Sequence, residues 1–479
     1  MIIPQIDWFS SLPIVFFSGM IVLILLVEAF VKKSADASFW LSVLGILVTI
    51  GFSALTVGQR GVSFSGMILQ GGYGSFFNIL FLLSALVTIV LSRDYLRRSH
   101  SDFGEFYLLI LLATLGMMLM ASAEDLIMIF LGLELMSVCL YVLAGFFRGK
   151  LQANEASLKY FLLGAFSTGF LLYGIALLYG AAHTTNIGDI VAHFQIVSQV
   201  KYFWLGIGLL LVGLAFKVAA VPFHMWVPDV YEGSPTPVTG FMSTGAKAAA
   251  FSALVLVFGF PAPLGDNVKL VVGILATASM ILGNVVALSQ TNLKRMLAYS
   301  SIAHAGYMLI GIAAMNQLGK EGILFYITSY LFMNLGAFGI IAMLEGEEGS
   351  SVSLDDYAGL AHRRPFIAAL MAVFMFTLSG LPPFGGFFGK YYLFLAAINA
   401  NLTWLAIVGV LASVVGAFYY IRVVVVMYFQ DVPESAAASS GLGSSLSTFG
   451  ITVIALVAIA VVQLGVYPAF LLDVIQHLF

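Results

Sequence analysis

The residues best suited to chemistry in this sequence are titratable side chains placed inside apolar runs. Lys217 and Lys247 lie in consecutive hydrophobic runs, and Lys390 lies in a later one. Glu134 and His304 are also enclosed by apolar neighbours. A charge at the centre of a membrane helix costs about 2.5–3.5 kcal/mol on insertion scales, so such residues usually serve a function. Amine, carboxylate and imidazole groups at that depth are suited to taking up and releasing protons.

The elements that must position these groups are predicted to be membrane-spanning helices. Of the 479 residues, 61% are hydrophobic and 9% are charged, which is more apolar material than a water-soluble core contains. Apolar runs of ~20 residues recur along the chain, and each is long enough to cross a bilayer as a helix. We therefore expect an all-α polytopic membrane protein in contact with the lipid bilayer, and no nucleic-acid partner.

Fourteen spans are predicted. They lie near residues 12–31, 39–57, 75–92, 106–122, 125–147, 157–180, 202–228, 237–260, 268–289, 297–315, 322–344, 366–399, 403–428 and 449–470. The amino-terminal segment carries Asp7 and no basic residue ahead of the first run, which favours a true span over a cleaved signal peptide.

The distribution of basic residues predicts the orientation, because cytoplasmic loops are enriched in Lys and Arg. Loops after odd-numbered spans hold eleven: Lys32, Lys33, Arg93, Arg97, Arg98, Arg148, Lys150, Lys294, Arg295, Arg363 and Arg364. Loops after even-numbered spans hold four: Arg60, Lys201, Lys269 and Lys320. Both termini are therefore expected on the non-cytoplasmic side of a bacterial inner membrane.

Two further basic residues lie inside spans but near their ends. The long side chains of Lys159 and Arg422 can reach the membrane interface from there. For both residues, this interfacial interpretation stays open beside a functional one.

Polar residues also repeat at helical spacing within several spans. The sets are Thr239, Ser243 and Lys247; Ser300, His304 and Tyr307; and Tyr326, Tyr330 and Asn334. Such spacing places each set on one face of its helix. Any one set is explained by hydrogen bonding between helices, but several sets beside buried charges indicate a hydrated path.

The seventh and twelfth spans are interrupted by proline. Pro222 breaks the first, and the sequence GLPPFGG, with Pro383, breaks the second. Paired interruptions of this kind are typical of transporters built from inverted repeats. Glu155 and Tyr160 match Glu321 and Tyr326 at an offset of 166 residues, and the two proline motifs match at 161.

This offset pairs spans four to eight with spans nine to thirteen, as two inverted five-helix repeats. The expected organisation is one transmembrane domain over residues 1–479. It comprises flanking helices (1–100), a first repeat (101–262), a second repeat (263–430) and a C-terminal helix (431–479).

Redox chemistry is not expected within this chain. The single cysteine, Cys139, excludes an internal disulfide and is expected to be a packing residue. His224 and His304 are the only histidines within spans, too few for the paired ligands of a haem bundle, and no Gly-rich phosphate loop occurs. We expect no cofactor and no metal in this chain.

Several long motifs resemble a known family. FLGLELMSVCLYVLAGF, FKVAAVPFHMWVPDVYEGSPTPVTGFMS, NLKRMLAYSSIAHAGYML and LSGLPPFGGFFGKYYLF are similar to the antiporter-like subunits of respiratory complex I, the proton-pumping NADH:quinone oxidoreductase. The resemblance covers nearly the whole chain. DVYEGSPTPVT and LELMSVCLYVLAGF resemble the subunit N branch more than its sister branches L and M.

The resemblance implies roles for individual residues. Glu134 corresponds to the carboxylate of the fifth helix, and Lys159 to a lysine of the sixth. Lys217 and Lys390 correspond to the lysines of the broken helices. Lys247 corresponds to the connecting lysine of the eighth helix, and His304 to a histidine thought to join two half-channels. A proton would enter from the cytoplasm onto Lys217, pass through Lys247 and His304 to Lys390, and leave on the far side.

The resemblance also implies partners and an energy source. Other membrane-arm subunits, including sister antiporter-like subunits, would contact this chain, and FMN and iron–sulfur clusters would lie in other subunits. Quinone reduction elsewhere in the complex would drive the transport. Two alternatives stay open: a subunit of a multi-subunit cation/proton antiporter, and a structural subunit of a membrane hydrogenase-like complex.

Overall fold

The computed structural model describes residues 7–31, 34–59, 61–259, 265–345, 352–431 and 447–478. Within these ranges, thirteen helices are long and apolar enough to cross a membrane. A further crossing consists of two shorter helices in succession, α17 and α18. The predicted all-α polytopic membrane protein with about fourteen spans is confirmed.

Most spans are single helices. They are α1 (Trp8–Phe30), α2 (Ala35–Thr56), α3 (Gly72–Arg98), α4 (Gly104–Ala121), α5 (Leu126–Ala144), α6 (Leu151–Ala182), α13 (Gly265–Leu288), α14 (Leu293–Ala314), α15 (Gln317–Leu344), α19 (Thr403–Phe429) and α21 (Thr448–Val466). The broken spans are α9 (Lys201–Val218) with α10 (Val227–Gly233), and α17 (Pro365–Ser379) with α18 (Gly385–Asn399). The eighth span is α11 (Thr236–Phe241), the π-helical turn η1 (Met242–Ala246) and α12 (Lys247–Phe258).

Short elements outside the spans were not predicted. They are the antiparallel strands β1 (Gly61–Ser63) and β2 (Ile68–Gln70), the helices α7 (Ile187–Ala192), α8 (Phe194–Val197), α16 (Leu360–Arg363) and α22 (Pro468–Gln476), and the 3-10 turn η2 (Leu354–Tyr357). The prediction that the last span reaches residue 470 was wrong. Pro468 begins α22, because proline cannot continue the helix that ends at Val466.

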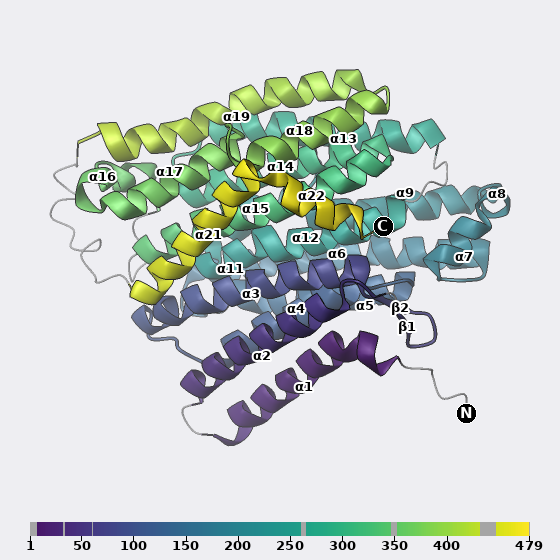
Figure 1. Ribbon diagram of the computed structural model, residues 1–479, viewed down its shortest axis with the longest axis horizontal. Coiled ribbons are helices and arrows are strands. Elements are labelled where there is room, and N and C mark those ends of the chain that lie inside the picture. The colour runs from purple at the N-terminus through teal and green to yellow at the C-terminus, as the bar shows by residue number, and fades with distance from the viewer. Residues whose placement is uncertain are drawn as a thin grey trace.

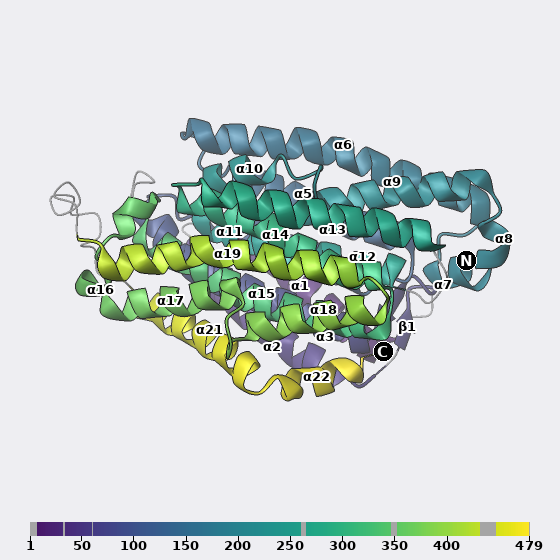
Figure 2. The same ribbon diagram turned by 90° about the horizontal axis from the view of Figure 1, so that it is seen from above.

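The long helices lie side by side along the longest axis of the molecule (Figures 1 and 2). The start of α1 and the end of α22 lie toward one end of the bundle, together with α7, α8 and the strands. We call this the terminal end. The opposite end holds α16 and the arginine-rich end of α3, and we call it the basic end.

Both broken helices are interrupted in the same way. α9 ends where Ala219 takes a left-handed conformation (φ 64°), and α17 ends where Gly380 does the same (φ 84°). A cis peptide bond follows each end, at Val221-Pro222 and at Pro382-Pro383. A left-handed residue ends a helix, and the prolines after it cannot restart the same hydrogen-bond ladder.

Packing partners correspond between the two halves of the chain. Helix α4 packs on α5 as α13 packs on α14, and α6 packs on α9 as α15 packs on α18. Helix α4 also contacts α12, as α13 contacts α19. These matching contacts are what the predicted repeat requires.

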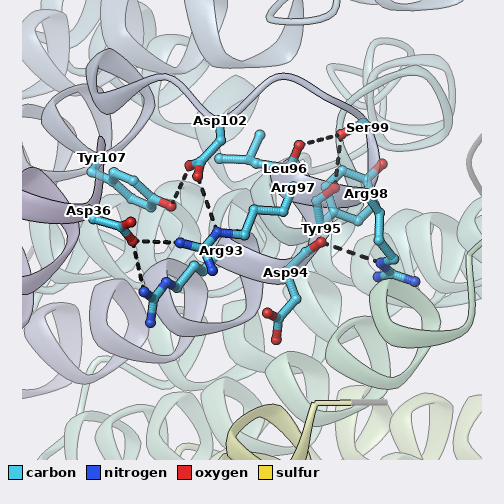
Figure 3. Close-up of polar contacts among 10 residues, drawn as sticks. All are labelled: Asp36, Arg93, Asp94, Tyr95, Leu96, Arg97, Arg98, Ser99, Asp102 and Tyr107. Atoms are coloured by element: carbon cyan, nitrogen blue, oxygen red, sulfur yellow. Dashed lines mark hydrogen bonds and ion pairs between the residues drawn. The ribbon is translucent and has the colours of Figure 1, made fainter. Parts of the chain in front are cut away.

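An ion-pair cluster joins α2, α3 and α4 at the basic end (Figure 3). Asp36 of α2 binds Arg93 and Arg97 of α3, at 2.7 and 2.6 Å. Arg97 also pairs with Asp102 at 3.3 Å, just before α4. The prediction that these arginines lie in a loop was wrong, because α3 runs on to Arg98 and its polar last turns project beyond the apolar run.

Arg98 fastens the end of α3 to the end of α15. Its guanidinium donates hydrogen bonds to the backbone carbonyls of Ala342, Met343 and Glu345, at 2.7, 3.0 and 3.1 Å. The last carbonyls of a helix lack partners within the helix, so the hydrogen bonds from Arg98 satisfy carbonyl groups at the end of α15. The flanking helix thereby holds a helix that lines the site described below.

We predict that Gly389→Ala destabilises the protein. A Cβ atom at Gly389 would lie 2.1 Å from the ring of Tyr326, a buried residue on α15. Overpacking of this kind costs about 1–3 kcal/mol. Gly208→Ala is the matched control, since a Cβ there meets nothing within 4 Å. Thermal unfolding of the purified complex should show a lower Tm for the first variant only; equal values would contradict the packing described.

Candidate proton-transfer site

Four of the predicted residues lie buried in the middle of the bundle. The relative exposure is 6% for Lys217, 2% for Lys247, 1% for His304 and 6% for Lys390. Within the described part of the chain, none of the three lysines has a carboxylate within 4.0 Å. Their ammonium groups are therefore stabilised by neutral oxygens and aromatic rings.

Lys217 lies in the last turn of α9, directly before the break. Its Nζ donates hydrogen bonds to Ser137 Oγ at 2.7 Å and to the Tyr141 hydroxyl at 3.3 Å, both on α5. The rings of Tyr141 and Tyr160 lie 5.5 and 5.9 Å from the ammonium. Aromatic faces attract cations at such distances, so the pocket favours a charged lysine without neutralising it.

Glu134 lies one helical turn from Ser137 on α5. It acts on Lys217 through its electric field, but Ser137 and Tyr141 take the direct contacts with the ammonium. The Oε1 atom of Glu134 is buried and accepts no hydrogen bond from the described residues. The carboxylate and the ammonium are thus neighbours without being an ion pair.

Lys247 follows a π-helical turn, a rare irregularity that is frequent at functional sites. Its Nζ donates to the backbone carbonyl of Ser301 at 2.6 Å and also to the Ser301 hydroxyl. The Tyr330 hydroxyl donates to the same Ser301 oxygen at 2.9 Å. Asn334 donates to Tyr330 at 3.0 Å and to Ser243 at 2.7 Å. Two of the predicted polar stripes therefore meet beside Lys247.

His304 lies between two tyrosines. Its Nδ1 shares a hydrogen bond with the Tyr326 hydroxyl at 2.5 Å, and its Nε2 shares one with the Tyr420 hydroxyl at 2.9 Å. The Tyr330 ring lies 5.1 Å from the imidazole, and Tyr330 also bonds Ser301. Tyr330 therefore lies between His304 and Ser301, the hydrogen-bond partner of Lys247.

Lys390 lies in α18, just after the second break. Its Nζ donates to the backbone carbonyl of Ser379, the last residue of α17, at 3.1 Å. The ammonium lies 4.7 Å from the ring centroid of Tyr307. Tyr307 in turn accepts a hydrogen bond from Asn284 at 3.1 Å, and its ring lies 5.8 Å from that of His304. Tyr307 is therefore a neighbour of both Lys390 and His304.

Lys159 is not brought together with these groups. Its ammonium pairs with Glu155 at 2.7 Å and with Asp229 of α10 at 2.6 Å, and its side chain is 41% exposed. Asp229 also binds Arg295 of α14 at 2.9 Å. Asp229 thus pairs with two cations, one from α6 and one from α14.

Several contact residues were missed by sequence reasoning. Ser137, Tyr141, Ser301 and Tyr420 are neutral residues of common types within spans, and their partners are far away in sequence. The only indication was spacing: Tyr141 lies seven residues after Glu134, on the same face of α5.

The fold and the site define a class of protein: a polytopic helical membrane protein with two broken helices and buried lysines beside a histidine. Within the described residues, no three His, Cys, Asp or Glu side chains gather as a metal site. The chain belongs to the family described as NADH:quinone oxidoreductase/Mrp antiporter, TM, whose profile matches residues 123–416.

Relatives and solved structures agree with this assignment. A protein of Trichlorobacter lovleyi named NADH-quinone oxidoreductase subunit N is 51% identical, over 88% of each chain. A chain of respiratory complex I from Thermus thermophilus superposes with a TM-score of 0.82 at 33% identity, covering 96% of this chain and 98% of that one. A chain of the Mrp complex from Dietzia sp. has a TM-score of 0.87 at 19% identity, covering 99% and 97%, and shows the shared fold alone.

We predict that Asp229→Asn weakens the joint between α6, α10 and α14. Partly exposed ion pairs contribute up to about 1 kcal/mol each, so a Tm lowered by a few degrees is expected. Thermal unfolding of the purified complex measures this difference; equal Tm values for the parent and the variant would contradict the joint described.

Proposed function

We propose that this chain is the antiporter-like subunit N of a proton-pumping NADH:quinone oxidoreductase. The observation that carries the proposal is the buried series Lys217, Lys247, His304 and Lys390. The ring of Tyr330 lies beside both Lys247 and His304, and the ring of Tyr307 lies beside both His304 and Lys390. A relative that is 51% identical over 88% of the chain is named NADH-quinone oxidoreductase subunit N. FMN and iron–sulfur clusters would lie in other subunits, since the residues described here supply acid–base groups rather than a redox centre.

The basic end would face the cytoplasm and both termini the opposite side of the bacterial inner membrane. Arginines and lysines are enriched in cytoplasmic connections, and Arg93, Arg97, Arg98 and Arg148 lie at or beside the basic end. In this orientation, neighbouring membrane-arm subunits, including sister antiporter-like subunits, would contact the apolar outer helices. We also propose that the first repeat covers residues 101–262 and that the second repeat covers residues 263–430.

Proton transfer would begin at Lys217. A negative Glu134 stabilises the ammonium form of Lys217, whereas a positive charge arriving from a neighbouring site destabilises it. A released proton would move through water to Lys247, then past Tyr330 and His304 to Lys390. Lys390 would release it toward the terminal end. Lys159, placed among Glu155 and Asp229, would tune the charge near the break rather than carry the proton.

The two alternatives differ in what surrounds the chain. A cation/proton antiporter would have the same fold without a redox partner. The likeness to the Mrp complex concerns the fold alone. Co-purification with flavin and iron–sulfur subunits supports the proposal, whereas transport by the isolated chain supports the antiporter. A purely structural role is disfavoured because three buried cations without carboxylate partners are costly to keep.

We predict that Lys217→Ala abolishes proton pumping coupled to NADH oxidation by the assembled complex. The hydroxyls of Ser137 and Tyr141 would remain, but the route would lack the ammonium whose change of charge starts each cycle. Lys269→Ala is the matched control, because that ammonium pairs with Asp266 at 3.6 Å, away from the series. Proton uptake into vesicles, measured per electron transferred, should fall only in the first variant. Pumping at the parent stoichiometry by a fully assembled Lys217→Ala complex would show that the assigned role is wrong.

A further inference from the structure

A polar cavity at the basic end plays no part in the route proposed above. It has a volume of about 220 Å³ and lies where the end of α3 meets the starts of α6, α11 and α14. The residues that concern us in its wall are Tyr95, Lys150, Glu232, Ser234, Lys294 and Glu345. Two of them, Lys294 and Glu345, are charged residues that are also buried.

Glu345 lies directly after the last turn of α15 and is only 6% exposed. Its carboxylate accepts a hydrogen bond from the Thr236 hydroxyl, and Arg98 binds its backbone carbonyl rather than the carboxylate. No cation lies within 4.0 Å of the carboxylate in the described part of the chain. A buried carboxylate without an ion-pair partner is costly, so its position calls for a function.

Lys294 faces the same cavity from α14 and is 3% exposed. Its Nζ donates to the backbone carbonyl of Ser234 at 2.9 Å, and it interacts electrostatically with Glu345. The prediction that Lys294 lies in a loop between two spans was wrong, because α14 begins at Leu293, capped by Asn292, and Lys294 in its first turn is buried. The cavity therefore holds opposite charges on either side of the α10–α11 connection.

A buried polar stripe leads from Glu345 to Lys247. Thr236, Thr239, Ser243 and Lys247 follow one another at intervals of three, four and four residues, which places them along one face of the eighth span. All four are 0 to 2% exposed. The predicted stripe thus has one further member, Thr236, and that member bonds the carboxylate in the cavity.

The stripe connects to the contacts of Lys247 by side-chain hydrogen bonds. Ser243 accepts from Asn334, which also donates to Tyr330, and Tyr330 donates to Ser301, the partner of Lys247. On α14, Ser301 lies seven residues after Lys294, two helical turns or about 10 Å. The polar stripe of the eighth span and the face of α14 that carries Lys294 and Ser301 therefore both run from the cavity to Lys247.

We propose that Glu345 is a proton-loading group that delivers protons from the basic end to Lys247. This second entry joins the proposed route at Lys247 in cycles that Lys217 starts, so it deepens the proposed function and rests on it. A hydronium ion in the cavity protonates the Glu345 carboxylate and leaves water. The carboxylic acid then gives its proton to the Thr236–Ser243 stripe and its water, and Lys247 in its amine form becomes an ammonium. Glu345 returns to the carboxylate, so each cycle moves one proton.

The test uses the whole complex in vesicles and measures protons translocated per electron. Glu345→Gln should lower this ratio roughly twofold or more, because the amide cannot take up a proton. Glu345→Asp should retain most of it. Thr236→Val keeps the carboxylate and the side-chain shape but removes the hydroxyl, and it should also lower the ratio. Glu105→Gln, an exposed carboxylate at the same end, is the control and should match the parent.

The outcomes separate this proposal from the proposed function. Pumping at the parent ratio by both Glu345→Gln and Thr236→Val, while Lys217→Ala fails to pump, overturns the loading role alone. Normal pumping by Lys217→Ala overturns the proposed function instead. If Glu345→Gln does not assemble, Thr236→Val decides the question: a lowered ratio supports the role, and a parent ratio refutes it.

Discussion

The structure depends on how a lysine ammonium is kept within hydrocarbon without an ion-pair partner. An ion pair would stabilise each charge but would also fix it, because a paired cation is slow to give up its proton. Lys217, Lys247 and Lys390 are held instead by hydroxyls, backbone carbonyls and ring faces. Such partners stabilise the charged form less than a carboxylate does, so the charge can be moved by changes nearby.

One of these partners comes from a helix break, and all three lysines lie beside an irregularity of their own helices. An intact helix uses all its central carbonyls internally, whereas an interrupted one leaves some free at membrane depth. Lys390 uses the carbonyl of the residue that ends α17, and Lys217 lies one residue from the end of α9. Lys247 lies directly after the π-helical turn, which is also an irregularity of its helix. Each lysine of the series therefore lies at a discontinuity, and the paired breaks are part of the site rather than defects of the fold.

Much of the fold could be predicted from the sequence, because the bilayer imposes a length and a composition on every span. The count of fourteen, the two breaks and the burial of Lys217, Lys247, His304 and Lys390 all follow from charge and proline within apolar runs. Contacts between distant helices do not. Nothing local distinguishes Ser301 or Tyr420 from other polar residues in spans. Lys294 was misjudged for a related reason: near a helix end, the direction of a side chain depends on neighbours that are remote in sequence. For Lys159 the sequence left an interfacial and a functional interpretation open, and its role stays a proposal.

The central claim is that Lys217, Lys247, His304 and Lys390 lie on one hydrated route. A map of the intact complex at a resolution that shows ordered water tests this most directly. The account predicts waters bridging Lys217 to Lys247, and further waters between His304 and Lys390, each with polar partners. A dry, apolar gap between any two of these residues, seen in a map that resolves water elsewhere in the membrane arm, would contradict it.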